Sequence, residues 1–173
     1  MKRRYLMQIL TGVILLALVL VLSMLPEPAA RYAALFAPAL VAVVTAAVFL
    51  NTPAAVLLGI LIPVCLYFIY WNSPFVPDYP VQALSLAVTG LVTGLCFSYL
   101  NAAFPAALLG VLSGCIVTAV TRVAYNFAHD LPYTFGDCVQ ELFLSRYPGL
   151  ILAAAAVPLV CYLIRKKQED RVK

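Results

Sequence analysis

The chain has 173 residues, of which 65% are hydrophobic and only 10% are charged, whereas an ordinary soluble domain has about 25% charged residues. The formal net charge is +4, but eight of the eleven Lys and Arg residues lie at the two tips rather than in one patch. Composition therefore excludes an ordinary soluble domain and argues against a nucleic-acid partner, and it predicts a single membrane domain over residues 1–173.

The basic tips also predict the orientation of the chain. Lys2, Arg3 and Arg4 open it, and five further basic residues lie between Arg165 and Lys173. Basic flanks of apolar spans stay on the cytoplasmic side of a membrane. Both termini are therefore expected in the cytoplasm, and two ends on one side require an even number of crossings.

The apolar runs predict an all-α integral membrane protein. A spanning helix needs about 20 mainly apolar residues, and such runs are found at about 5–25, 33–50, 53–71, 81–100, 103–125 and 147–164. Tight cytoplasmic turns are expected at Asn51 and Asn101, each followed by a proline that suits the first turn of a helix. Pro38, Pro63 and Pro158 fall inside the expected spans, where each is expected to kink its helix.

The connections on the opposite side are longer and more polar. They are Pro26–Arg31, Trp71–Pro80 and Asn126–Arg146, and they contain the only histidine and several aromatic residues. Binding residues occur disproportionately on such loops, which predicts recognition at the outer face. An interfacial belt of Trp and Tyr is the alternative interpretation of the aromatic residues.

Arg122 is the charged residue that falls inside an expected span, near the outer end of the fifth. A charge there is costly and typical of a functional site, and the alternative is that Arg122 extends its side chain to the interface. Together with residues of the outer connections it completes the candidate substrate-binding set: Trp71, Asn72, Asp78, Tyr79, Arg122, Tyr125, Asn126 and His129.

Small residues recur at every fourth position in the fourth and fifth spans. Such ridges let helix backbones approach closely in a membrane. They are open to two interpretations, namely packing within this chain and docking of a partner helix. With the small residues of the first span, the candidate docking set is Gly12, Ala17, Gly90, Gly94, Gly110 and Gly114.

Catalytic motifs are not found in the sequence. There is no nucleophile elbow, phosphate-binding glycine loop or HExxH pattern, and the cysteines lack the spacing of a metal site. We therefore expect neither an enzyme nor a bound cofactor or metal. Any active transport would have to draw its energy from partner subunits.

Three stretches resemble the substrate-binding S components of energy-coupling factor (ECF) vitamin transporters. FAPALVAVVTAAVFLNTPAAVLLGILIP at Phe36–Pro63 is similar to the family's second and third helices, with a Gly and a Pro in the third. NSPFVPDYPVQALSLAVTGLVTGL at Asn72–Leu95 resembles the Pro-rich outer loop and the helix after it. YPGLILAAAAVPLVCYL at Tyr147–Leu163 resembles the last helix, so the likeness covers most of residues 33–165.

The resemblance implies a six-helix protein of the bacterial plasma membrane that captures a water-soluble vitamin or related micronutrient near the outer face. It also implies a transmembrane coupling subunit and two ATPase subunits as partners, with delivery by toppling of the S component. The first helix lacks the AxxxA pattern that family members often have, since Gly12 and Ala17 are out of register with it. The resemblance does not identify the vitamin.

The alternative interpretation of the chain is a non-transporting six-span membrane scaffold resembling MreD of bacterial cell-wall assembly. Such scaffolds have the same size and hydropathy as S components. In that interpretation the glycine ridges bind partner helices and the outer connections contact other proteins.

Overall fold

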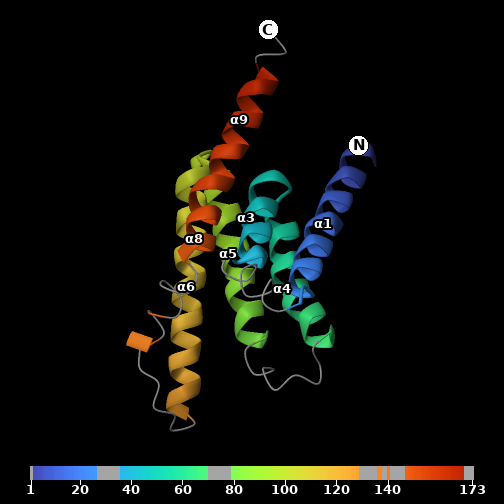
Figure 1. The fold of residues 1–173 in the computed structure, drawn as a ribbon. Helices are drawn as coiled ribbons and strands as arrows, with labels where there is room; N and C mark the ends of the chain where they lie inside the picture. Colours follow the sequence, from blue (N-terminus) through green and yellow to red (C-terminus); the bar gives the residue numbers. More distant parts are fainter. Residues whose placement is uncertain are drawn as a thin grey trace.

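The computed structural model describes residues 2–26, 36–69, 79–128, 136–137, 140 and 147–169, and no strand occurs among them. The described part of the protein is all-helical, with six helical stretches in these ranges (Figure 1). They are α1 (Lys2–Ser23), α3 (Pro38–Phe49), α4 (Thr52–Ile69), α5 (Tyr79–Leu100), α6 (Ala103–Ala128), and the uninterrupted run of α8 (Tyr147–Ile151), the π-helical segment η3 (Leu152–Ala156) and α9 (Val157–Glu169). This confirms the predicted helical class and its six helices.

The two predicted tight turns are present, and the sequence explains both. Asn51 precedes α4, and its Oδ1 accepts a hydrogen bond of 2.8 Å from the Ala54 N–H, as a helix N-cap does. Asn101 follows α5 with φ of 50°, in the left-handed region that Asn adopts more readily than most residues. Each turn thus ends one helix and starts the next within a few residues.

The second helix differs from its prediction. A span of 33–50 was expected with a kink at Pro38, but α3 begins at Pro38, because Ala37 has φ of 43° and ψ of 59° and Pro38 occupies the first turn; residues 33–35 are outside the described part. Twelve residues rise only about 18 Å, less than the hydrocarbon core of about 30 Å. α3 is therefore a short internal helix.

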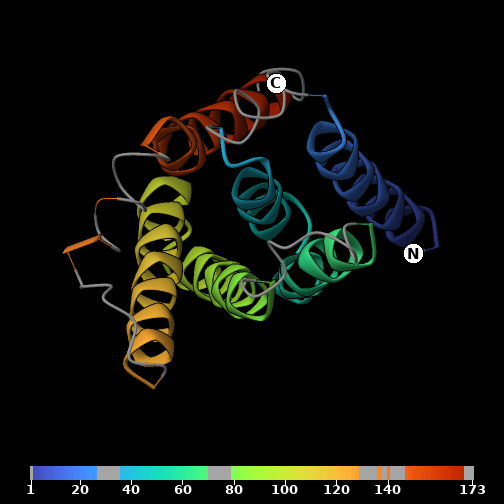
Figure 2. The same ribbon diagram turned by 60° about the horizontal axis from the view of Figure 1, so that its bottom comes forward.

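α3 lies at the centre of the bundle and the other helices surround it (Figure 2). Its side chains are small and apolar, and those from Ala42 to Val44 and from Ala46 to Val48 are buried. One side packs with Ala55, Leu58 and Ile62 of α4 and Val19 of α1. The other side packs through Val44 with Ala107 and Val111 of α6 and Ala153 of η3.

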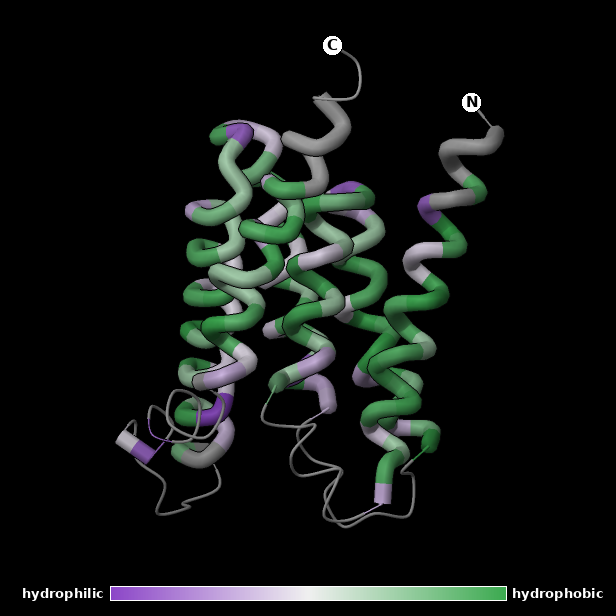
Figure 3. The backbone as a smooth tube through the Cα atoms, turned by 45° about the horizontal axis from the view of Figure 1, so that its top comes forward, coloured by the Kyte–Doolittle hydropathy of each residue, from purple (hydrophilic) through white to green (hydrophobic). Residues whose placement is uncertain are grey.

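The outer faces of the helices are apolar as well. Leu57, Phe68 and Ile116 are more than half exposed, and hydrophilic residues gather mostly near helix ends and turns (Figure 3). Three of the described helices are long and apolar enough to cross a membrane: Thr52–Ile69, Tyr79–Leu100 and Ala103–Tyr125. Length and composition therefore support association with a membrane.

The bundle has two distinct ends (Figure 1). At one end, here called the terminal end, α1 begins, α9 finishes, and the turns at Asn51 and Asn101 lie. At the other, here called the loop end, α4 finishes, α5 begins and α6 finishes. The start of α1 and the end of α9 thus belong to the same end of the bundle as the two short turns.

Candidate functional site

The predicted substrate-binding residues that the structure describes all belong to the loop end. Tyr79 is the first residue of α5, and Arg122, Tyr125 and Asn126 lie in the last two turns of α6. The other four candidates, namely Trp71, Asn72, Asp78 and His129, fall outside the described residues. The structure therefore gathers half of the predicted set around two helix ends.

Aromatic side chains meet where α4 ends and α5 begins. The ring of Tyr79 packs edge-on against that of Tyr67, with centroids 6.0 Å apart, and Phe68 lies edge-on to Tyr67 at 5.7 Å. Edge-to-face packing holds such rings in defined orientations. The sequence pattern alone does not single out Tyr67, although it lies two residues before the end of α4 and so close in the chain to the Trp71–Pro80 connection.

A row of hydroxyl side chains runs between α5 and α6 and is here called the polar seam; it comprises Ser85, Thr89, Thr93 and Thr118. Ser85 Oγ donates a hydrogen bond of 2.8 Å to the Gly114 carbonyl. Thr118 Oγ1 lies 2.8 Å from Ser85 Oγ and 3.0 Å from the Gly114 carbonyl, so its single proton is donated to one or the other. The polar seam joins the two helices side by side.

The glycines of α6 set the register of this pairing. Thr93 packs on Gly110, Thr89 packs on Gly114, and Ser85 bonds to Thr118. Each step of four residues along α6 is therefore matched by a step of four back along α5. Extending this register by one more step aligns Arg122 with Val81, two residues after Tyr79.

Arg122 itself is half-buried, and its Nε atom is covered by the protein. Arg122 follows Thr118 by four residues, so both residues lie on the same face of α6. Thr118 contacts Ser85 of α5 from this face. Tyr125 is 48% exposed. Arg122 and Tyr79 are thus candidates that the bundle partly encloses, whereas Tyr125 lies at its surface.

Internal contacts account for the four glycines of the predicted docking ridges. Gly90 and Gly94 are buried against Ala55 and Thr52 of α4, and Gly110 and Gly114 are buried against α5. On α1, Ala17 is exposed and Gly12 is half-buried near Leu50. These contacts agree with packing within this chain, which is one of the two interpretations of the ridges. Docking of a partner through any of the six residues stays a prediction.

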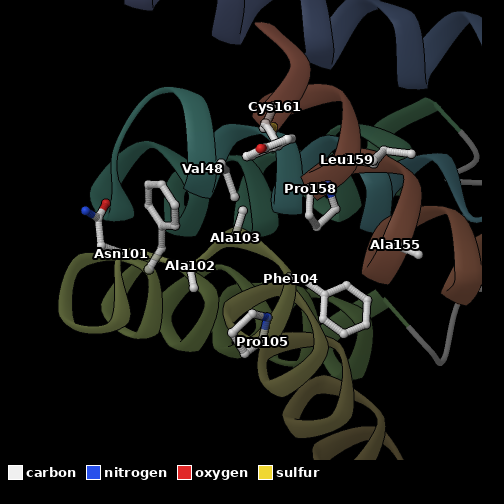
Figure 4. A pocket seen from close by; sticks show the side chains of 12 residues that line it. Val48, Asn101, Ala102, Ala103, Phe104, Pro105, Ala155, Pro158, Leu159 and Cys161 are labelled. Carbon is white, nitrogen blue, oxygen red and sulfur yellow. The ribbon is translucent and has the colours of Figure 1, made fainter. Parts of the chain in front are cut away.

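A cavity of about 610 Å³ lies at the terminal end, where no binding residue was predicted (Figure 4). Three parts of the chain line it, which are the end of α3, the α5–α6 turn with its flanks, and the η3–α9 region. The lining residues are Val48, Phe97, Asn101, Ala102, Ala103, Phe104, Pro105, Ala155, Pro158, Leu159, Cys161 and Tyr162. The one sequence feature that coincides with the cavity is Pro158, a proline within an apolar run. It does not reveal which segments of the chain meet around the cavity.

No protein-family model, curated protein or solved structure matches the chain.

Proposed function

We propose that the protein is a membrane-embedded, substrate-binding subunit of an ECF-type importer, with both termini in the cytoplasm of a bacterium. It captures a water-soluble vitamin or related micronutrient at the loop end. It then delivers the solute by toppling against a transmembrane coupling subunit, and two partner ATPase subunits supply the energy. The sequence resemblance and the helical bundle with its two distinct ends support this proposal.

The position of Arg122 is the observation that carries the proposal. A charged residue in an apolar helix is costly and is typical of a site that uses the charge. Arg122 is half-buried next to the polar seam, and the register of α5 and α6 sets it level with the start of α5. A guanidinium there is suited to hold a carboxylate or phosphate with two parallel hydrogen bonds.

Aromatic rings at the same end suit the rest of such a solute. Tyr67 and Tyr79 hold each other at the helix ends, and flat heterocyclic rings stack on or against aromatic side chains. The predicted Trp71, Asn72, Asp78 and His129 would complete the site with further stacking and hydrogen-bonding groups. This arrangement fits a ligand that has both a ring and an anionic group.

The test is mass spectrometry of small molecules released by denaturing the purified, detergent-solubilised protein. We expect one stoichiometric vitamin-like compound. A protein that carries no such compound, shows no thermal shift with a panel of vitamins, and copurifies with cell-wall assembly proteins would be a scaffold instead.

Arg122→Ala tests the role of the guanidinium in binding. It removes the proposed charge-assisted hydrogen bonds to the solute, which contribute about 1.5–3 kcal/mol. We expect the dissociation constant of the recovered compound to rise about ten- to hundredfold. Isothermal titration in detergent measures this change. The control is Ile116→Ala on the same helix, whose side chain is 63% exposed, and it should bind as the natural protein does. Equal affinity in Arg122→Ala would remove Arg122 from the site.

A further inference from the structure

The cavity at the terminal end is apolar and large enough for a ligand. Its volume of about 610 Å³ lies within the range of about 300–1,000 Å³ that is typical of small-molecule sites. Asn101 and Tyr162 bring polar atoms to a lining that is otherwise mostly hydrocarbon. Such a lining suits an apolar chain rather than a water-soluble solute, because it offers few partners for the hydrogen bonds that buried polar groups need.

The cavity opens to the side of the bundle. Phe104 at the start of α6 is 54% exposed, and Leu159 and Tyr162 of α9 are 59% and 61% exposed, although all three line the cavity. Val48 and Cys161 are buried behind them. The mouth therefore lies between α6 and α9 on the outer surface of the helices (Figure 4), and in a bilayer that surface faces acyl chains.

The wall formed by the last helix is distorted where it borders the cavity. In η3 the Val157 N–H bonds to the Leu152 carbonyl, and Pro158 follows immediately without an N–H to donate. Ala155 of η3 and Pro158 both line the cavity. Single π-turns of this kind are frequent at functional sites, which marks this wall as more than an ordinary packing face.

Basic residues lie at the same end of the bundle as the cavity. Arg165, Lys166 and Lys167 occupy the helical turn of α9 that follows Cys161 and Tyr162. Lys2, Arg3 and Arg4 begin α1, also at the terminal end. Basic residues beside a pocket between membrane helices attract anionic lipid headgroups.

We propose that the cavity binds an acyl chain of one anionic phospholipid, whose phosphate lies at the level of the basic turn Arg165–Lys167. The inference rests on the membrane insertion assumed in the proposed function, but not on solute binding at the loop end. An acyl chain fills the apolar lining through the lateral mouth, and the charge at the terminal end selects an anionic headgroup.

Native mass spectrometry of the full-length protein in detergent tests this inference, with phosphatidylglycerol and phosphatidylcholine of identical chains as probes. We expect one phosphatidylglycerol per protein, bound more tightly than phosphatidylcholine. Ala155→Trp fills the mouth of the cavity, and excluding about two methylenes from burial weakens binding about tenfold. The control Val21→Trp puts the same ring at a position of α1 that is 62% exposed, and it should leave lipid binding unchanged.

A second variant separates charge from shape. Replacing Arg165, Lys166 and Lys167 together by Gln should abolish the preference for phosphatidylglycerol, since each basic residue near a membrane surface is worth about fivefold, while either lipid still binds. Equal binding of both lipids to the natural protein would overturn the anionic selection. Undiminished binding to a folded Ala155→Trp variant, or a dimer retained in place of lipid, would overturn the site. A protein that binds its solute but retains no lipid would leave the proposed function intact.

Discussion

Gly59 illustrates at the level of one residue how closely the helices approach. It is buried in α4 against α5, and a Cβ atom built on it would lie 2.7 Å from the Leu86 carbonyl carbon and 2.8 Å from the Ala87 nitrogen. These are backbone atoms, which cannot turn aside as a side chain can. Membrane helices without a hydrophobic driving force between them depend on such close backbone packing.

Gly59→Ala is therefore expected to destabilise the bundle. The added methyl group forces α4 and α5 apart, and overpacking of this kind typically costs about 1–3 kcal/mol. Thermal unfolding in detergent should show a lower midpoint than that of the natural protein.

Gly12→Ala is the matched control for this substitution. A Cβ there would meet only the Leu50 Cδ1, at 3.9 Å, which is an ordinary contact. Because Ala also forms helix better than Gly by about 1 kcal/mol, the midpoint should stay the same or rise. If Gly59→Ala were tolerated as well as Gly12→Ala, the close approach of α4 and α5 would be wrong.

Between whole helices, the polar seam joins α5 to α6. Ser85 and Thr118 contact each other across the two helices, and Ser85 also donates to the Gly114 carbonyl. Hydrogen bonds between membrane helices contribute about 0.6 kcal/mol on average and up to about 1.7 kcal/mol. The seam therefore adds orientation and register to helices that glycine packing already brings together.

A double-mutant cycle with Ser85→Ala and Thr118→Val measures this contribution. We expect each single variant to be destabilised and their coupling free energy to be about 0.6–1.7 kcal/mol. Unfolding in detergent as a function of denaturant gives the four stabilities. Additive effects would mean that the Ser85–Thr118 hydrogen bond contributes nothing to the pairing of α5 and α6.

Several elements could be predicted from the sequence because local chemistry specifies them. The turn at Asn51 has an amide side chain that caps α4, and the turn at Asn101 has a residue that adopts a positive φ. The start of α3 could not be predicted in the same way. Apolar residues continue on both sides of Pro38, so hydropathy does not reveal that Ala37 takes a positive φ and that α3 begins only at Pro38.

The sequence also could not predict which helix packs against each face of another helix. A face that packs on another helix and a face that meets lipid are both apolar, so hydropathy does not distinguish them. The contact of Tyr67 with Tyr79 joins two helices. The cavity at the terminal end requires Val48, the α5–α6 turn and α9 to meet. Only the arrangement of the helices in space reveals either feature.

For the molecule as a whole, the separation of its two ends has consequences for topology. The proposed solute site belongs to the loop end, whereas the cavity proposed to bind lipid, the short turns, and the basic residues that begin α1 and lie near the end of α9 belong to the terminal end. If positive flanks hold the terminal end in the cytoplasm, the solute site faces outward. The same orientation gives the cavity access to lipids of the cytoplasmic leaflet, where anionic headgroups are concentrated.

Labelling of single cysteines tests this orientation. In a variant whose five cysteines are replaced by alanine, Asn51→Cys reports on the terminal end and Phe127→Cys, at a position 86% exposed, reports on the loop end. A membrane-impermeant maleimide should label Phe127→Cys in spheroplasts, whose plasma membrane is intact but whose outer layers have been removed. It should label Asn51→Cys only in inside-out vesicles, because the bilayer separates the two positions. The reverse pattern would place the solute site in the cytoplasm and contradict import, and labelling of both positions from one side would contradict a bundle that crosses the membrane from end to end.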